Sequence, residues 1–179
     1  PALPFSAGLW NDGLEHRWTR WSIGMRELWM AAGLALGLCA VPAQSRPLPA
    51  GGVTAAEVIE VLQANGYRAE EDVDGVGDPM VRSATDGSNY AIYFYGCERG
   101  RCTTIQFGVA FSMKQSPGLA KINEWNREMR FGRAYLDSEM DPAVQMDVDL
   151  ELGATTEQLQ SVIGTWGAVV PAFKNFIDF

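Results

Sequence analysis

Apolar and polar residues alternate most regularly between Cys102 and Met113. Successive side chains of a β-strand point to opposite faces, so a period of two is typical of a strand with one buried face. We therefore predict a strand here, packed on one side against a core. The odd positions are Thr103, Ile105, Phe107, Val109 and Phe111, and the even positions are Thr104, Gln106, Gly108, Ala110 and Ser112.

A second alternating segment runs from Ala143 to Leu152. Its apolar positions are expected to face the core, and its acidic positions to face water. Like charges two residues apart also discourage a further strand from pairing at an edge. The inward set is Val144, Met146, Val148, Leu150 and Leu152, and the outward set is Gln145, Asp147, Asp149 and Glu151.

Four shorter strand-like runs accompany these two segments. Turn residues such as Asp74-Gly75 and Asp86-Gly87 separate the first of them. Connections this short join antiparallel neighbours, so the sequence predicts an antiparallel meander. The runs are residues 67–73, 79–84, 89–96 and 133–137.

The first two helices are predicted from capping residues that precede apolar residues at helical spacing. Thr54 and Glu57 match a capping box, and Gly66 is a suitable stop for that helix. Ser116 caps the second helix, with Pro117 at its first position. The expected apolar stripes are Val58, Ile59, Val61 and Leu62 in the first helix and Leu119, Ile122, Trp125 and Met129 in the second.

A third helix follows the cap at Thr155, and Pro171 is expected to kink it or to begin a new turn. The predicted order of elements is α-β-β-β-β-α-β-β-α. Runs of strands bracketed by helices indicate an α+β domain, in which helices pack on one face of an antiparallel sheet. The apolar stripe of the third helix is Leu159, Val162, Ile163, Trp166, Val169, Val170 and Phe173.

The N-terminal part has the pattern of a targeting segment. An uncharged apolar run, residues 31–41, follows Met25-Arg26 and ends in Val41-Pro42-Ala43, with small residues where a signal peptidase needs them. Even counted from Leu28 the run has about 14 residues, fewer than the roughly 20 of a membrane-spanning helix. We interpret residues 25–43 as a signal peptide, which predicts a periplasmic or secreted protein with no membrane anchor after cleavage.

The rest of the chain divides around this segment. Residues 1–24 show no clear period, and we interpret them as an over-extended start upstream of Met25. Residues 44–52 form a linker rich in Pro and Gly, and residues 53–179 form the domain.

Charge is concentrated in the domain. Residues 1–43 contain as many acidic as basic residues, so the whole net charge of −8 lies after Ala43. Binding of nucleic-acid phosphates needs a basic face, and so does binding to an anionic membrane. The composition therefore argues against nucleic acid and against a membrane surface as partners.

Cys97 and Cys102 bracket a turn between two predicted strands. In an oxidising compartment such a pair closes a structural disulfide when the two Cβ atoms approach to about 4 Å. A redox-active pair and a metal site are the alternatives. The spacing does not match the C-x-x-C redox motif, and the domain offers no second ligand pair for zinc. We expect a disulfide and no metal.

Catalytic chemistry is restricted by the absence of histidine from the domain. The sole histidine of the chain is His16, so Ser–His and Cys–His arrangements and histidine metal sites are excluded after residue 43. The serines lie in turns or caps. We therefore expect no catalytic residue and no cofactor.

Residues 122–137 read INEWNREMRFGRAYLD. This helix-to-strand motif, with strands before it and a Thr-capped helix after it, resembles the YbjN family over roughly residues 53–179. Members of that family are described as bacterial sensory transduction regulators, and their fold is similar to that of type III secretion chaperones. The resemblance implies this fold and a homodimer. Many members are cytoplasmic, and this chain departs from them in its signal peptide and its cysteine pair.

Aromatic residues fall on both faces of one predicted strand, at Tyr90, Tyr93, Phe94 and Tyr95. One face must fill the core, and the other is either covered by the third helix or exposed as an interaction patch. We expect Tyr93 and Tyr95 to contact a protein or peptide partner through the sheet.

A second candidate set lies on and after the second helix. It consists of Trp125, Asn126, Arg127 and Arg130. Structurally, the asparagine would tie the helix to the sheet and the arginines would pair with carboxylates; functionally, the set would grip an anionic or peptide ligand. We predict an exported, non-enzymatic, chaperone-like binding or regulatory domain, with a small-ligand or anion sensor as the alternative.

Overall fold

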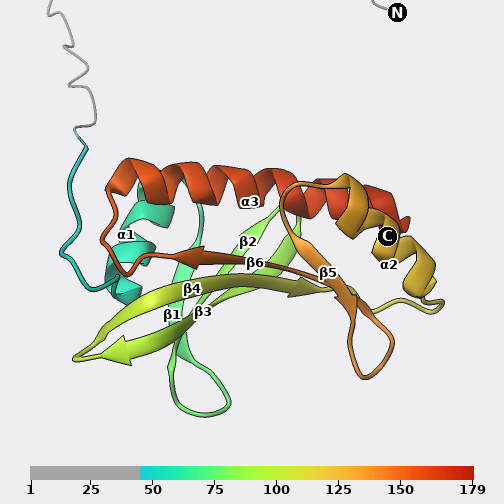
Figure 1. Ribbon diagram of the computed structural model, residues 1–179, viewed down its shortest axis with the longest axis horizontal. Coiled ribbons are helices and arrows are strands. Elements are labelled where there is room, and N and C mark those ends of the chain that lie inside the picture. The colour runs from blue at the N-terminus through green and yellow to red at the C-terminus, as the bar shows by residue number, and fades with distance from the viewer. Residues whose placement is uncertain (1–44) are drawn as a thin grey trace, which may run out of the picture. The chain divides into compact units, whose positions relative to one another are not determined.

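The computed structural model describes residues 45–179 (Figure 1). The signal peptide, the upstream segment and the first residue of the linker lie outside the described residues. The described part contains a six-stranded antiparallel sheet with the strand order β1-β2-β3-β4-β6-β5. The strands are β1 (Ala69–Val73), β2 (Pro79–Thr85), β3 (Ser88–Glu98), β4 (Arg101–Ala110), β5 (Arg133–Leu136) and β6 (Pro142–Asp149).

Three helices complete the described part, and the predicted order of elements is confirmed. All three contribute buried side chains to one core together with the sheet, so they pack on the same face. Figure 1 shows α3 lying along the length of the sheet, with α1 and α2 near its two ends. The helices are α1 (Ala55–Ala64), α2 (Gly118–Glu128) and α3 (Thr156–Ile177).

The helix caps were predicted correctly for α1 and α3 but not for α2. Both bonds of the capping box are present at α1, where Thr54 accepts from the Glu57 amide at 3.2 Å and Glu57 accepts from the Thr54 amide at 2.9 Å. Thr155 likewise accepts from the Gln158 amide. At α2 the cap position is Pro117 rather than Ser116, and the Ser116 hydroxyl still accepts from the Gly118 amide, at 3.4 Å. The helix begins at Gly118, one residue later than predicted.

The apolar stripe of α2 is shorter than predicted. Leu119 is 70% exposed and Met129 is 41% exposed, whereas Ile122 and Trp125 are buried. The helix covers one end of the sheet next to the edge strand β5, and we attribute the short stripe to this position. Only its middle turns meet the core.

One further expectation needs correction, and Pro171 lies in a continuous helix. Leu152 is 97% exposed, because β6 ends at Asp149 and the chain then turns, with the Gly153 amide bonded to the Leu150 carbonyl. Pro171 lies inside α3, which continues as a single helix to Ile177. Buried neighbours on both sides, Val170 and Phe173, hold this part of α3 on the sheet, and we attribute the tolerance of the missing proline N–H to that packing.

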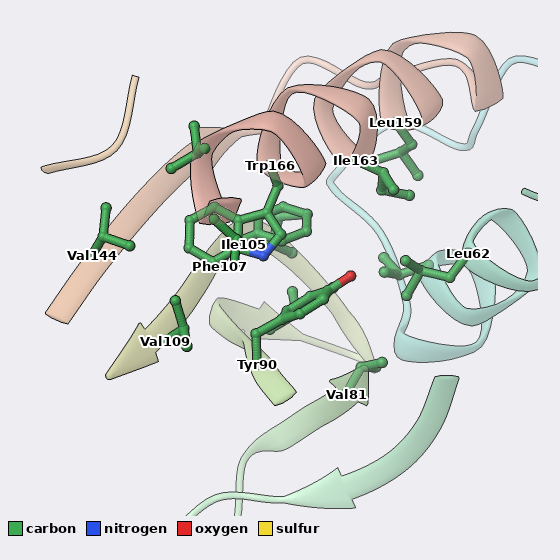
Figure 2. Close-up of a cluster of buried hydrophobic side chains, with 14 of the residues drawn as sticks. Leu62, Val81, Tyr90, Ile105, Phe107, Val109, Val144, Leu159, Ile163 and Trp166 are labelled. Carbon is green, nitrogen blue, oxygen red and sulfur yellow. The ribbon is translucent and has the colours of Figure 1, made fainter. Parts of the chain in front are cut away.

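Aromatic rings form the centre of the core, between α3 and the sheet. Trp166 of α3 is fully buried, and its ring centroid lies 5.8 Å from that of Tyr90 and 5.6 Å from that of Phe107. Figure 2 shows the Trp166 side chain directed from α3 onto these strand residues, with Leu62 of α1 at the side. Edge and tilted contacts of this kind add to the hydrophobic free energy of burial.

Candidate functional site

The outer face of the sheet is the face turned away from the helices. In the strand register, Tyr93 of β3 lies beside Gln106 of β4, which lies beside Asp147 of β6. The Gln106 amide donates to Asp147 at 2.6 Å, and the Tyr95 hydroxyl donates to Gln106 at 3.5 Å. The two tyrosines named by the sequence analysis therefore lie on one face, joined to polar side chains that alternation had placed there.

A second polar group lies at the β5 edge of the same face. The Arg133 guanidinium donates to Gln145 at 2.8 Å, and the Gln145 amide donates to the Tyr135 hydroxyl at 3.1 Å. Sequence reasoning did not select Gln106, Gln145 or Tyr135. The sequence pattern could have identified Gln106 and Gln145, because they occupy polar positions of the two most regularly alternating strands.

The outer face has a hollow where β3 and β4 carry small residues. Ala91 of β3 pairs with Gly108 of β4, and a Cβ atom built on Gly108 would lie 3.5 Å from the Tyr93 ring and 3.7 Å from Gln145. The hollow encloses about 290 Å³, and Arg68 and Arg82 also line it. A partner side chain that enters this hollow would contact Ala91 and Gly108 on the floor of the sheet.

Two loops extend beyond the outer face. Figure 1 shows the β1–β2 and β5–β6 loops projecting on the side of the sheet opposite α3. Each loop carries an exposed apolar side chain, Val76 at 85% and Met140 at 49% exposure. The outer face thus lies between two projecting loops, both with apolar surface available for contact.

The charges of the outer face are partly neutralised within it. Arg82 of β2 is bonded to Asp72 of β1, and this bond holds the pKa of the Asp72 carboxyl below its usual value. Burial raises the pKa of the Tyr95 hydroxyl, and the nearby phenol of Tyr93 and the Asp147 carboxylate raise it further. Tyr95 therefore stays protonated near neutral pH and retains its hydrogen-bond donor.

The second candidate set is dispersed by the fold. Trp125 is 1% exposed; its indole donates to the Gly132 carbonyl at 2.6 Å and its ring packs against Phe173. Most of the Trp125 ring therefore lies in the core, and its remaining surface lines a hollow of about 330 Å³ that Arg130 and Phe131 also line. Asn126 is bonded to both backbone groups of Ala134, which matches the structural alternative for this residue.

The two arginines of that set point to separate neighbours. Arg127 is paired with Glu128 at 3.1 Å on the surface, and Arg130 lies over the ring of Phe131 with 5.3 Å to its centroid. Two arginines bind one anion only when both guanidinium groups point to it, and these two contact different neighbours. Among the described residues, Trp125 and Arg130 line one hollow, whereas Arg127 is paired elsewhere and Asn126 is bonded to Ala134.

The disulfide between Cys97 and Cys102 is present at the end of the β3–β4 hairpin. The backbone of Cys102 is bonded to that of Val53 in both directions, at 2.8 and 3.0 Å, so the hairpin also holds the segment that leads into α1. Arg101 reinforces this contact through Glu57 at 3.0 Å and the Gly52 carbonyl. Sequence reasoning missed Arg101, and no pattern in the chain marks it.

The described residues contain neither a cluster of metal-binding side chains nor a helix suited to span a membrane. Within residues 45–179, no group of three or more His, Cys, Asp and Glu side chains is placed to hold a metal ion. No helix of this part combines the length and the apolar character that a membrane span requires.

Comparison with known proteins supports the resemblance drawn from the motif. The family model YbjN, described as "Putative bacterial sensory transduction regulator", matches residues 54–179. No curated protein and no solved structure matches the chain. The family match spans the whole domain from the cap of α1 to the end of the chain, and the chain therefore belongs to the YbjN family.

Proposed function

We propose that this protein is a non-enzymatic regulatory domain that binds a polypeptide partner through the outer face of its sheet. The observation that carries the proposal is the uncovered face itself. All three described helices pack on the inner face, and the outer face presents Tyr93, Tyr95 and Tyr135 beside amide side chains. Tyrosine combines a large apolar ring with a hydrogen-bonding tip, and it is enriched where proteins bind each other.

The shape of the face favours a polypeptide over a small molecule. The hollow at Gly108 is shallow and open, and the exposed apolar side chains lie far apart along the chain, on two loops and several strands. Small-molecule sites enclose most of their ligand, whereas a protein partner spreads over a broad face and inserts single side chains. The family description as a regulator is consistent with this activity.

The proposed function includes export of the protein from the cytoplasm. The disulfide supports an oxidising compartment, since such bonds are rare where glutathione keeps thiols reduced. Together with the signal-like pattern of residues 25–43, this favours a periplasmic or secreted regulator. The small-ligand or anion sensor stays a prediction, and the contacts of Arg127 and Arg130 lend it no support.

Site-specific photo-crosslinking tests the proposal. Benzoylphenylalanine replaces Tyr95 or Tyr135 in the full chain, expressed in its own cells and irradiated there. We expect both positions to form adducts with a polypeptide, and we expect Tyr93→Ser in the same chain to reduce their yield. The control is the same replacement at Leu152, which is exposed in the turn before α3. Equal adducts at Leu152, or none at Tyr95 and Tyr135, would contradict the proposal.

A further inference from the structure

The edge strand β5 is protected from further pairing by a side chain. Ala134 turns its backbone groups away from β6, and the amide of Asn126 on α2 satisfies both of them. Asn126 accepts from the Ala134 N–H at 2.8 Å and donates to the Ala134 carbonyl at 3.0 Å. A side-chain amide has the donor and acceptor of a peptide group, so Asn126 occupies the place of a neighbouring strand.

The next outward position of β5 has no such partner. Backbone groups alternate in direction along a strand, so Leu136 turns its N–H and C=O to the same side as Ala134. The opposite residue on β6 confirms this, because the Pro142 carbonyl bonds to Phe111 on its other side. Outside the β5–β6 ladder, no hydrogen bond among the described residues reaches the N–H or the C=O of Leu136. One rung of the sheet edge is therefore open.

A groove lies beside this open rung. It encloses about 600 Å³ between α2 and β5, and its walls carry no charged side chain. Leu119 of α2 is 70% exposed beside it, and Asn123, one turn before Asn126, has an exposed side chain with no hydrogen bond to the described residues. The lining residues are Leu119, Ala120, Ile122, Asn123, Asn126, Ala134, Tyr135 and Leu136.

We propose that this groove binds a short, extended, uncharged segment of a polypeptide partner, which pairs with Leu136 as an added strand. Three observations determine this occupant. The free N–H and C=O of Leu136 match the backbone of an extended chain. The uncharged walls would leave a charged guest without a counter-ion after desolvation. Tyr135 belongs to both the groove and the outer face, so a partner held there can continue onto that face.

The bound segment has a defined set of contacts. Its backbone exchanges two hydrogen bonds with Leu136, and the Asn123 amide bonds to its next peptide group. An aliphatic side chain of the segment covers Leu119 and Ile122. The groove shares Tyr135 with the outer face, but it does not include Tyr93 or Tyr95. The groove proposal therefore goes beyond the proposed function, and an experiment can contradict one proposal without contradicting the other.

The test uses an array of short peptides with blocked termini and no charged residue, each with Leu or Val at its centre. The full chain is labelled and applied to the array, and the affinity for the peptides retained is measured in solution. Leu136→Pro removes the free N–H without breaking a backbone hydrogen bond, and proline is accepted on edge strands. It also removes a side chain that packs against the core. We expect it to weaken binding by about tenfold, the effect of one lost backbone hydrogen bond.

A second variant keeps the test decisive if Leu136→Pro does not fold, as judged by circular dichroism. Leu119→Glu places a charge in the groove wall at a position that is already exposed, and we expect it to abolish binding. Leu152→Glu is the matched control, the same substitution at another exposed leucine, and it should leave binding unchanged. Failure of the chain to bind any peptide, or equal binding by Leu119→Glu, would overturn the proposal.

Discussion

Tyr90 and Tyr95 belong to the same strand, β3, but lie on opposite faces of the sheet. Tyr90 is 5% exposed and packs its ring against Trp166 and Phe107, whereas Tyr95 is 44% exposed and donates its hydroxyl to Gln106. One residue type thus fills the core on the inner face and offers a polar contact on the outer face. Under the proposed function, stability is carried by the inner face and recognition by the outer face, and three experiments test this division.

The largest effect is expected from Trp166→Ala on the inner face. The substitution removes a fully buried ring that contacts two aromatic neighbours, and a large-to-small change of this kind lowers the free energy of unfolding by about 3–5 kcal/mol. Urea denaturation followed by tryptophan fluorescence and circular dichroism measures the change. A loss below about 1 kcal/mol would contradict the central position of this residue.

An intermediate effect, dependent on pH, is expected from Glu57→Gln. Burial raises the pKa of Glu57, but hydrogen bonds from Arg101 and Thr54 outweigh it, so the pKa in the folded protein lies below 4.5. The stability that ionised Glu57 contributes is therefore complete above that pH and is lost as the pH falls through the folded pKa. The unfolding free energies of wild type and Glu57→Gln should differ at neutral pH and converge in acid.

Asp72→Asn is the matched control for this comparison, because Asp72 is paired with Arg82 on the outer face. The Glu57 and Arg101 side chains are 19% and 22% exposed, whereas those of Asp72 and Arg82 are 37% and 62% exposed. Solvent screens the exposed pair more strongly. Denaturation at several pH values should show a weaker pH dependence of the mutational effect for Asp72→Asn than for Glu57→Gln.

The smallest effect on stability is expected from Tyr95→Ser on the outer face. The side chain is 44% exposed, and its single hydrogen bond to Gln106 is long, so the free energy of unfolding should change by no more than about 0.5 kcal/mol. The same variant should lose adducts with the partner at Tyr135 in the crosslinking experiment. A large loss of stability would show that the outer face also holds the fold together.

Much of the fold could be predicted because local chemistry determines it. The alternation around Phe107 and Val144 placed two strands and the orientation of their side chains, and the hydroxyls of Thr54 and Thr155 marked two helix starts. The position of α2 depends on tertiary contacts. Nothing in the local sequence shows that β5 pairs outside β6, and the exposure of Leu119 follows from that arrangement.

Part of the candidate site was also predicted, because strand alternation is a local pattern. Tyr95 was selected because strand alternation separates it from Tyr90, and the structure places them on opposite faces. Trp125 was selected from its place beside arginines, but its indole instead bonds to the Gly132 carbonyl in the α2–β5 turn. That turn requires glycine, since Gly132 has φ +83° and a Cβ atom there would lie 2.8 Å from Val144. Only the tertiary fold reveals this contact.

The position of the disulfide has a consequence for the fidelity of folding. Cys97 and Cys102 are opposite each other in the β3–β4 ladder, in the same register that pairs Phe94 with Ile105 and Tyr95 with Thr104. A slip of one residue along β3 would exchange its two faces, so that tyrosines entered the core and Phe94 faced water. The bond joins residues that are opposite each other in the correct register, so it favours that register over the slipped one. Formation of the disulfide therefore favours the register that keeps Phe94 in the core and Tyr95 on the outer face.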